Sequence, residues 1–326
     1  MQRIDFYRLC RIYSDLALEA HDLLRGATRQ EVPGVKEDKE TYPEATVTTV
    51  TIFNNVGEQA LGKPQGTYIT IEAPVLLTNN PPAHENIANI LGQKISYLLQ
   101  KHNIGLTDPI LVVGLGNWEA TPDSLGPRII RDFTVTQHLF KYAPQSVPPG
   151  TRPVSAISPG VLGTTGIETA DIIRGIIDKV KTFKAIIAID ALAAGDLKRI
   201  GTNIQVCDTG INPGSGIGSQ RLAINQQNMG VPVIAIGIPT VVHAGVIIFE
   251  ALEHIKLLYP NLGVEFPQQI IKQLIAQVLR PFGGNLVVTP KEIDELIHNQ
   301  AWVIGAALNQ ALHKTLLQTK AAILMH

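Results

Sequence analysis

The chain alternates between short apolar runs and longer segments in which apolar positions recur at helical spacing. The short runs are rich in Val, Ile or Thr, which is typical of strands. These strand candidates are residues 47–53, 67–71, 110–113, 154–157, 184–190, 204–207, 231–236 and 286–288. Between them, predicted helices cover residues 15–24, 83–101, a segment after Asp123, a segment after Glu168, 246–258, 268–280 and a final segment from 289–292 onward. Strands that alternate with helices predict an α/β fold, with a mostly parallel sheet and helices on both faces.

Two further local patterns add detail to this outline. Residues 31–44 carry Pro33, Gly34, Pro43 and several charges, so a loop is predicted there. Thr165 and Glu168 stand three apart, as in a capping box, and predict the start of the helix that follows. No internal repeat, low-complexity tract or linker interrupts the chain, which favours a single domain with terminal elaborations.

Composition and charge exclude several classes of function. The 326 residues are 45% hydrophobic and only 17% charged, with a formal net charge of −1. Such a chain has no basic field for nucleic acid or an anionic membrane. No apolar run is long enough to span a bilayer, and the first residues lack a secretory signal. With only Cys10 and Cys207, a disulfide framework is not expected, and a cytoplasmic protein is predicted.

Two aspartates at predicted strand ends are the strongest candidates for chemistry. Asp123 follows the strand 110–113 and its glycine-rich exit, and Asp190 closes the apolar run 185–189. In an open α/β sheet, ligands bind in the crevice outside the carboxyl ends of the strands. Two carboxylates that meet there can share acid and base roles. The alternative is that each aspartate caps the helix after it, and the pattern alone leaves both interpretations open.

Two glycine-rich segments resemble nucleotide-binding loops without matching them. Gly114 and Gly116 form a G-x-G, but Glu119 stands where the third glycine of a dinucleotide fingerprint belongs. The loop 212–219 is not followed by the Lys-Ser or Lys-Thr of a P-loop. This second loop is either a tight turn over the sheet or a nest of backbone N–H groups that lines a site. Its candidate donors are Gly214, Ser215 and Gly216.

No metal site or cofactor is predicted. The nine histidines show no pair at ligand spacing. His243 is the one histidine near a predicted strand end, and a hydrogen-bonded structural role is the simpler interpretation. Cys207 is expected to be a buried, unreactive thiol rather than a nucleophile, because no histidine is placed near it by sequence.

Long motifs in register connect the chain to a known family. They are 15–20, 62–64, 68–72, 112–118, 121–123, 152–157, 163–169, 188–194, 208–216 and 289–294. Together they resemble the germination protease family of endospore-forming bacteria, endopeptidases that degrade small acid-soluble spore proteins. The resemblance covers almost the whole chain. It implies a fold similar to the hydrogenase-maturation endopeptidases, which is a phosphorylase/hydrolase-like arrangement.

The resemblance also implies functional details. The family is described as atypical aspartic proteases whose two essential acids match Asp123 and Asp190. Its members are made as zymogens, and the matching self-processing bond lies near Asp15–Leu16. This implies a propeptide at 1–15 and a single protease domain at 16–326. A homotetramer in the spore interior is implied, with small acid-soluble spore proteins as substrates and no direct contact with nucleic acid or membrane.

The sequence departs from the family pattern at three places. Tyr13-Ser14 precede Asp15 where Arg-Thr is usual, Glu119 replaces a common Asn, and His243 replaces an Asp. A second acid at Glu119 is expected to raise the pKa of Asp123 by like-charge repulsion.

The same crevice is also compatible with two other functions. The first is a nickel-dependent maturation-type endopeptidase, although the loop 212–218 contains no histidine to match its ligand. The second is a non-catalytic scaffold that binds a partner in the same crevice.

Overall fold

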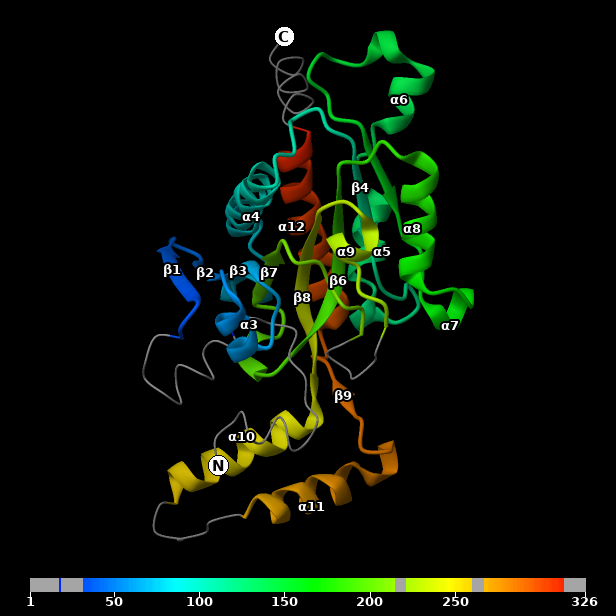
Figure 1. The fold of residues 1–326 in the computed structure, drawn as a ribbon. Helices are drawn as coiled ribbons and strands as arrows, with labels where there is room; N and C mark the ends of the chain where they lie inside the picture. Colours follow the sequence, from blue (N-terminus) through cyan, green and yellow to red (C-terminus); the bar gives the residue numbers. More distant parts are fainter. Residues whose placement is uncertain (1–17, 19–31, 215–220, 260–266, 314–326) are drawn as a thin grey trace.

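The computed structural model describes residues 18, 32–214, 221–259 and 267–313 (Figure 1). The predicted helix 15–24 (apart from Leu18), the bond Asp15–Leu16 and the loop residues Ser215 and Gly216 therefore lie outside the described residues. The strands are β1 (Val35–Thr41), β2 (Thr46–Ile52), β3 (Gly66–Glu72), β4 (Ile110–Gly114), β5 (Val154–Ile157), β6 (Ala185–Ala194), β7 (Asn203–Cys207), β8 (Val233–His243) and β9 (Val287–Val288).

Helices connect and cover these strands. They are α3 (Asn55–Leu61), α4 (Pro81–Lys101), α5 (Leu125–Asp132), α6 (Gln137–Tyr142), α7 (Leu162–Thr165), α8 (Thr169–Val180), α9 (Gln226–Met229), α10 (Ala244–Leu258), α11 (Gln268–Leu279) and α12 (Ile293–Leu312). A short 3₁₀ turn, η2 (Thr121–Asp123), precedes α5. The long predicted helix 83–101 and the predicted helices 246–258 and 268–280 are confirmed within a few residues.

The strands form one mixed sheet in the order β1-β2-β3-β7-β8-β6-β4-β5, with β9 paired to β8. The strands β5, β4, β6 and β8 run parallel to one another. From β8 through β7, β3 and β2 to β1 the pairing is antiparallel. The predicted α/β fold is confirmed, and the parallel half is the part that carries the candidate site.

Helices cover both faces of the sheet. On one face, α4, α5 and α12 pack their apolar sides against the strands, with Ile87, Leu91 and Val303 among the buried residues. On the other face α8 packs through Ile173 and Ile177. Figure 1 shows α4 and α12 together on one side and α8 on the opposite side. Because strands covered on both faces bury every side chain, β4 and the first half of β6 are continuous apolar runs.

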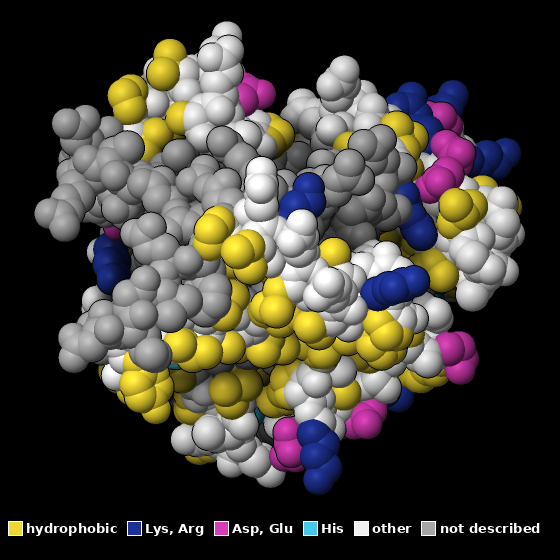
Figure 2. Space-filling view, turned by 90° about the horizontal axis from the view of Figure 1, so that it is seen from below, with side chains coloured by type: hydrophobic (Ala, Val, Ile, Leu, Met, Phe, Trp, Pro, Cys, Tyr) yellow, Lys and Arg dark blue, Asp and Glu magenta, His cyan; other side chains and the backbone are white. Residues whose placement is uncertain are grey.

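An outlying layer lies beyond the end of the sheet. There β6 and β8 extend past their neighbours (Figure 1). Val242 of β8 joins a separate apolar cluster with Val246 of α10 and Ile271 of α11. Seen from this end, hydrophobic side chains form a broad band on the surface (Figure 2). The exposed apolar residues of this layer include Leu257, Leu258, Tyr259, Ile270, Val278 and Phe282.

Two local predictions are wrong. The segment 31–44 is not a loop, because β1 pairs with β2 from Val35 opposite Ile52 to Thr41 opposite Thr46. Its charges fit an edge strand, where charged side chains discourage pairing with other chains. The capping box is also absent, since Thr165 ends α7 and its Oγ1 accepts the N–H of Ile167. The N-cap of α8 is Glu168, whose side chain makes no cap hydrogen bond.

Candidate functional site

A step in the sheet creates the site. The strand β4 ends at Gly114, opposite Ile189 of β6, and the N–H of Leu115 makes a last bond to the Ile189 carbonyl at 2.7 Å. The strand β6 continues to Ala194 beside β8. Asp190 was predicted to close its strand, and this is wrong, because it lies inside β6. Asp190 is nevertheless one residue past Ile189, the last β6 residue that pairs with β4. It therefore lies at the carboxyl end of the neighbouring strand β4.

Asp123 reaches the same place from the loop after β4. The backbone of Gly116 approaches the Asp123 backbone so closely, at a φ of +113°, that any side chain would overlap the Asp123 carbonyl oxygen. The N–H of Asn117 donates to Asp123 Oδ2 at 2.8 Å. Asp123 does not cap α5, because Ser124 holds the N-cap position without a side-chain cap bond.

Asp190 does not cap a helix either. Its Oδ1 accepts the N–H of Ala191 at 2.9 Å, and both residues belong to β6. The side chain is buried, with 6% of the residue exposed. Neither carboxylate is therefore used as a helix cap, so the capping interpretation is wrong for both.

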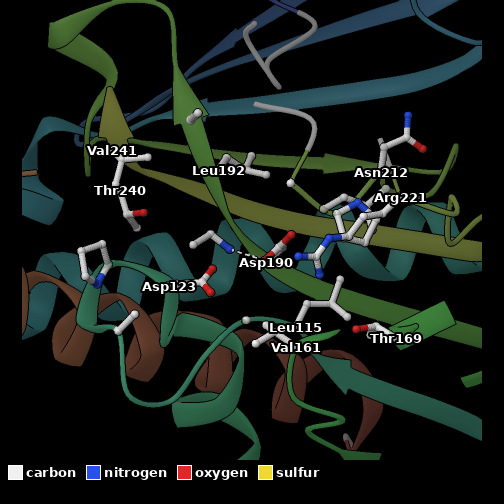
Figure 3. A pocket seen from close by; sticks show the side chains of 18 of the residues that line it. Leu115, Asp123, Val161, Thr169, Asp190, Leu192, Asn212, Arg221, Thr240 and Val241 are labelled. Carbon is white, nitrogen blue, oxygen red and sulfur yellow. Dashed lines mark hydrogen bonds between the residues drawn. The ribbon is translucent and has the colours of Figure 1, made fainter. Parts of the chain in front are cut away.

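The two carboxylates line one cavity of about 340 Å³. In Figure 3 both side chains point into this common space, from η2 and from β6. The other lining residues are Leu115, Gly116, Ala120, Pro122, Gly160, Val161, Thr169, Ala191, Leu192, Ala193, Ile211, Asn212, Pro213, Gly214, Arg221, Thr240, Val241 and Val287. A mostly apolar cavity with a few convergent polar groups is the usual form of a binding or active site.

The surroundings of Asp123 favour its protonated form. Burial raises the pKa of Asp123 above its ordinary value, and the Asn117 N–H and the positive charge of Arg221 oppose this in part. The expected cause, repulsion from Glu119, is wrong, because burial is the dominant effect and Glu119 does not contribute to the shift. The Glu119 N–H instead donates to Asn117 Oδ1 at 3.0 Å, which steadies the loop.

Arg221 is the main site residue that the sequence did not predict. It lines the cavity, and in Figure 3 its guanidinium group points toward Asp190. It stands just after the glycine-rich loop, where no periodic pattern distinguishes it from a surface arginine. Of the predicted loop donors, Gly214 lines the cavity, while Ser215 and Gly216 lie outside the described residues.

His243 and Cys207 have the structural roles expected of them. His243 is the N-cap of α10, and its Nδ1 accepts the N–H of Gly245 at 3.0 Å. Burial lowers the pKa of His243, which keeps the imidazole neutral and able to accept. Cys207 is a buried free thiol, and burial raises its pKa.

Within the described part of the chain, no group of three or more His, Cys, Asp or Glu residues is placed to hold a metal ion. Among the described residues that line the cavity, two have such side chains, Asp123 and Asp190. Among the described helices, none has both the length and the hydropathy that a membrane crossing needs. The fold and the cavity thus define an α/β protein with a pair of acids at the end of a parallel strand.

Comparison with known proteins places the chain in a family. The model of the germination protease family matches residues 15–266 and 256–324. The germination protease of Caldanaerobacter subterraneus subsp. tengcongensis is 46% identical over 325 residues, covering 97% of this chain and 98% of that protein. The one from Clostridium acetobutylicum is 39% identical, with 94% and 96% covered. The chain therefore belongs to the germination protease family, as its motifs indicated, and is a protease.

A solved structure shows a weaker similarity. A nickel–iron hydrogenase maturation protease from Thermococcus kodakarensis matches 60% of this chain and 92% of its own, at 14% identity and a TM-score of 0.26. A similarity at this level supports no conclusion about mechanism.

Proposed function

We propose that this protein is an endopeptidase that degrades small acid-soluble spore proteins in the spore interior, using Asp123 and Asp190 as a metal-free acid–base pair. The observation that carries the proposal is that both carboxylates line one cavity at the end of β4. Membership in the germination protease family supports the substrate class.

The proposed chemistry needs one proton between the two acids. Carboxylates that share a site cannot both ionise easily. We assign the proton to Asp123, because burial raises the pKa of its carboxyl. Asp190 takes a proton from water as the oxygen attacks the peptide carbonyl, and Asp123 protonates the carbonyl oxygen. On collapse, Asp190 passes its proton to the leaving amine and Asp123 regains one from the hydroxyl. General acid–base help of this kind contributes about 10²–10⁴-fold in rate.

Charge that develops on the carbonyl oxygen needs further support. Gly214, Ser215 and Gly216 are the proposed backbone donors, and Gly214 lines the cavity. Arg221 places a positive charge in the same cavity. Donors aimed at a developing oxyanion are worth about 10²–10³-fold each.

The proposed zymogen carries its propeptide at residues 1–15, cut near Asp15–Leu16, and residues 16–326 form the protease domain. The burial of Leu18, which is only 4% exposed, supports this division. Leu18 packs with Tyr68 and Cys207, which line a second cavity next to the site. Deleting residues 1–15 is expected to give constitutive activity, and a truncated protein that is folded but inert would contradict this arrangement.

A homotetramer is the proposed assembly. The exposed apolar side chains of α10 and α11 support it, because patches of this kind mark protein–protein contacts (Figure 2). The measurement is the mass in solution by light scattering. A mass of one chain at micromolar concentration would refute the assembly.

Incubation with a small acid-soluble spore protein tests the catalytic proposal. The intact protein should make a discrete cut, and Asp123→Asn and Asp190→Asn should each lose at least about 10³-fold in rate with an unchanged circular dichroism spectrum. Activity that a chelator removes would favour the nickel-dependent alternative. Binding of the spore protein without any cut would favour the scaffold.

A further inference from the structure

The loop that carries Asp123 is held from outside the cavity. Trp118 follows directly after Asn117, whose N–H contacts Asp123, yet Trp118 does not line the cavity and is 46% exposed. The guanidinium carbon of Arg128 lies 5.7 Å from the centre of the Trp118 ring, and that of Arg131 lies 5.6 Å from it. Both arginines belong to α5. Cations at such distances are attracted to the ring face, so α5 holds the start of the loop.

Arg128 also reaches the end of the loop. Its Nε donates to Ser124 Oγ at 2.9 Å, and this hydroxyl donates to the Thr121 carbonyl at 2.8 Å. Ser124 is fully buried and adjacent to Asp123. One guanidinium group therefore contacts the loop on both sides of the catalytic candidate.

From these contacts we infer that Arg128 and Trp118 are positioning residues, which close the loop so that the Asn117 N–H stays aimed at Asp123 Oδ2. This inference rests on the proposed function, because it matters only if Asp123 takes part in the reaction. Neither residue lines the cavity, so neither is expected to contact a substrate bound there. They act on the reaction through the geometry of Asp123.

Arg131 provides a matched control. It lies over the same ring, but its Nε and Nη2 donate to the neighbouring Asp132 at 2.9 and 2.6 Å. These bonds go to Asp132 and not to Ser124 or the loop backbone, and the Arg131 side chain is exposed. Removing Arg131 takes away a cation over Trp118 and leaves the Arg128 bond intact.

The charged groups around Asp123 remain in place in these variants. They are Asp190 on β6, Arg221 before α9, Glu119 on the loop itself and Asp294 on α12, which accepts the Thr121 hydroxyl at 3.1 Å. What changes is the bond from Asn117, which favours the ionised carboxylate. A weaker bond raises the pKa of Asp123 further. Since Asp123 is the proposed proton holder, the alkaline limb of the pH–rate profile should move to higher pH.

The experiment compares Arg128→Gln and Trp118→Leu with Arg131→Gln and Trp118→Phe in the cleavage of a small acid-soluble spore protein. The first two variants should lose about ten- to a hundredfold in kcat, as expected for a misplaced catalytic group. Their KM should stay within about twofold, and their alkaline limb should rise by about half to one pH unit. The two control variants should stay close to the unaltered protein, because each keeps a cation over an aromatic ring and the Ser124 bond.

Three outcomes would overturn the inference. A higher KM with unchanged kcat would mean that Trp118 contacts substrate. An equal loss in Arg131→Gln would mean that general surface charge is responsible. Full activity in Arg128→Gln, while Asp123→Asn is inert, would refute the positioning role and leave the proposed function standing. If Asp123→Asn is itself active, the proposed function fails first. Should Arg128→Gln fail to fold, the half-exposed Trp118 still provides the test through its Leu and Phe variants.

Discussion

Gly116→Ala should separate the geometry of the site from the stability of the fold. Gly116 has a φ of +113°, which side chains rarely adopt, and its added Cβ would overlap the Asp123 carbonyl oxygen. The same Cβ would also lie 3.2 Å from Asp123 Oδ1. Because the overlapping atoms belong to backbone, no flexible side chain can relieve the contact. The loop must move by about 1 Å, and Asp123 moves with it.

The size of the effect follows from that displacement. A misplacement of about 1 Å can lower the rate about 10²-fold. The unfavourable backbone conformation adds about 1–3 kcal/mol of destabilisation. Gly116→Ala is therefore expected to lose about 100-fold in kcat and a few kcal/mol of unfolding free energy. The first is measured by cleavage of a small acid-soluble spore protein, and the second by urea unfolding.

Gly62→Ala is the matched control. Gly62 also has a positive φ, +64°, as the C-cap of α3, but a Cβ there meets no atom within 4 Å. This variant should lose about 1 kcal/mol of stability and keep its kcat. Normal kcat in a folded Gly116→Ala protein would refute the close approach to Asp123. Equal losses of activity in both variants would show that general destabilisation, and not the position of Asp123, is responsible.

Four further predictions concern charge. Arg221→Gln removes a positive charge that lowers the pKa of Asp123, so the alkaline limb of the pH–rate profile should move to higher pH. Asp123→Asn should raise the urea midpoint at pH 7, because burial makes the ionised Asp123 carboxylate destabilising in the folded protein. This gain should vanish below about pH 4, where Asp123 is protonated in both the folded and the unfolded protein. Burial lowers the pKa of His243, so the folded protein should lose stability as the pH falls below about 6.5 and the unfolded chain takes up the proton. His243→Asn should keep the helix cap and make this loss smaller. Asp208→Ala should lower the unfolding free energy by about 3 kcal/mol, because the buried carboxylate accepts three hydrogen bonds, one of them from Lys101 at 2.8 Å.

The elements that the sequence predicted well are those whose own pattern decides them. The helix α4 presents one apolar face over 21 residues, and the two-residue alternation of a strand does not fit the spacing of its apolar positions. The edge strand β1 was missed because an edge position permits the same charges that mark a loop. The start of α8 was misplaced because the hydroxyl of Thr165 bonds the turn after α7 instead of the helix.

The candidate site was predictable in its acids and not in the groups around them. Asp123 and Asp190 follow apolar runs whose burial the sequence reveals. Arg221 lies near them because it is three residues before Ile224, which pairs with Ile211 beside the cavity, and local pattern does not encode that pairing. The contact between Trp118 and Arg128 could not be predicted from the sequence either, because it depends on the angle at which α5 leaves the loop.

The two acids are held in different ways, and this has a consequence for how the site can vary. The backbone of Asp190 is fixed inside the β6–β8 ladder, opposite Gly237, so its position changes only if the sheet changes. The backbone of Asp123 is fixed by loop contacts, chiefly those of Gly116 and Ser124. Loop substitutions that leave the Gly116 conformation intact should therefore alter activity more than stability, whereas substitutions around Asp190 should alter both. The position of Asp123 relative to Asp190 is therefore set by the loop, against a strand that the sheet holds in place.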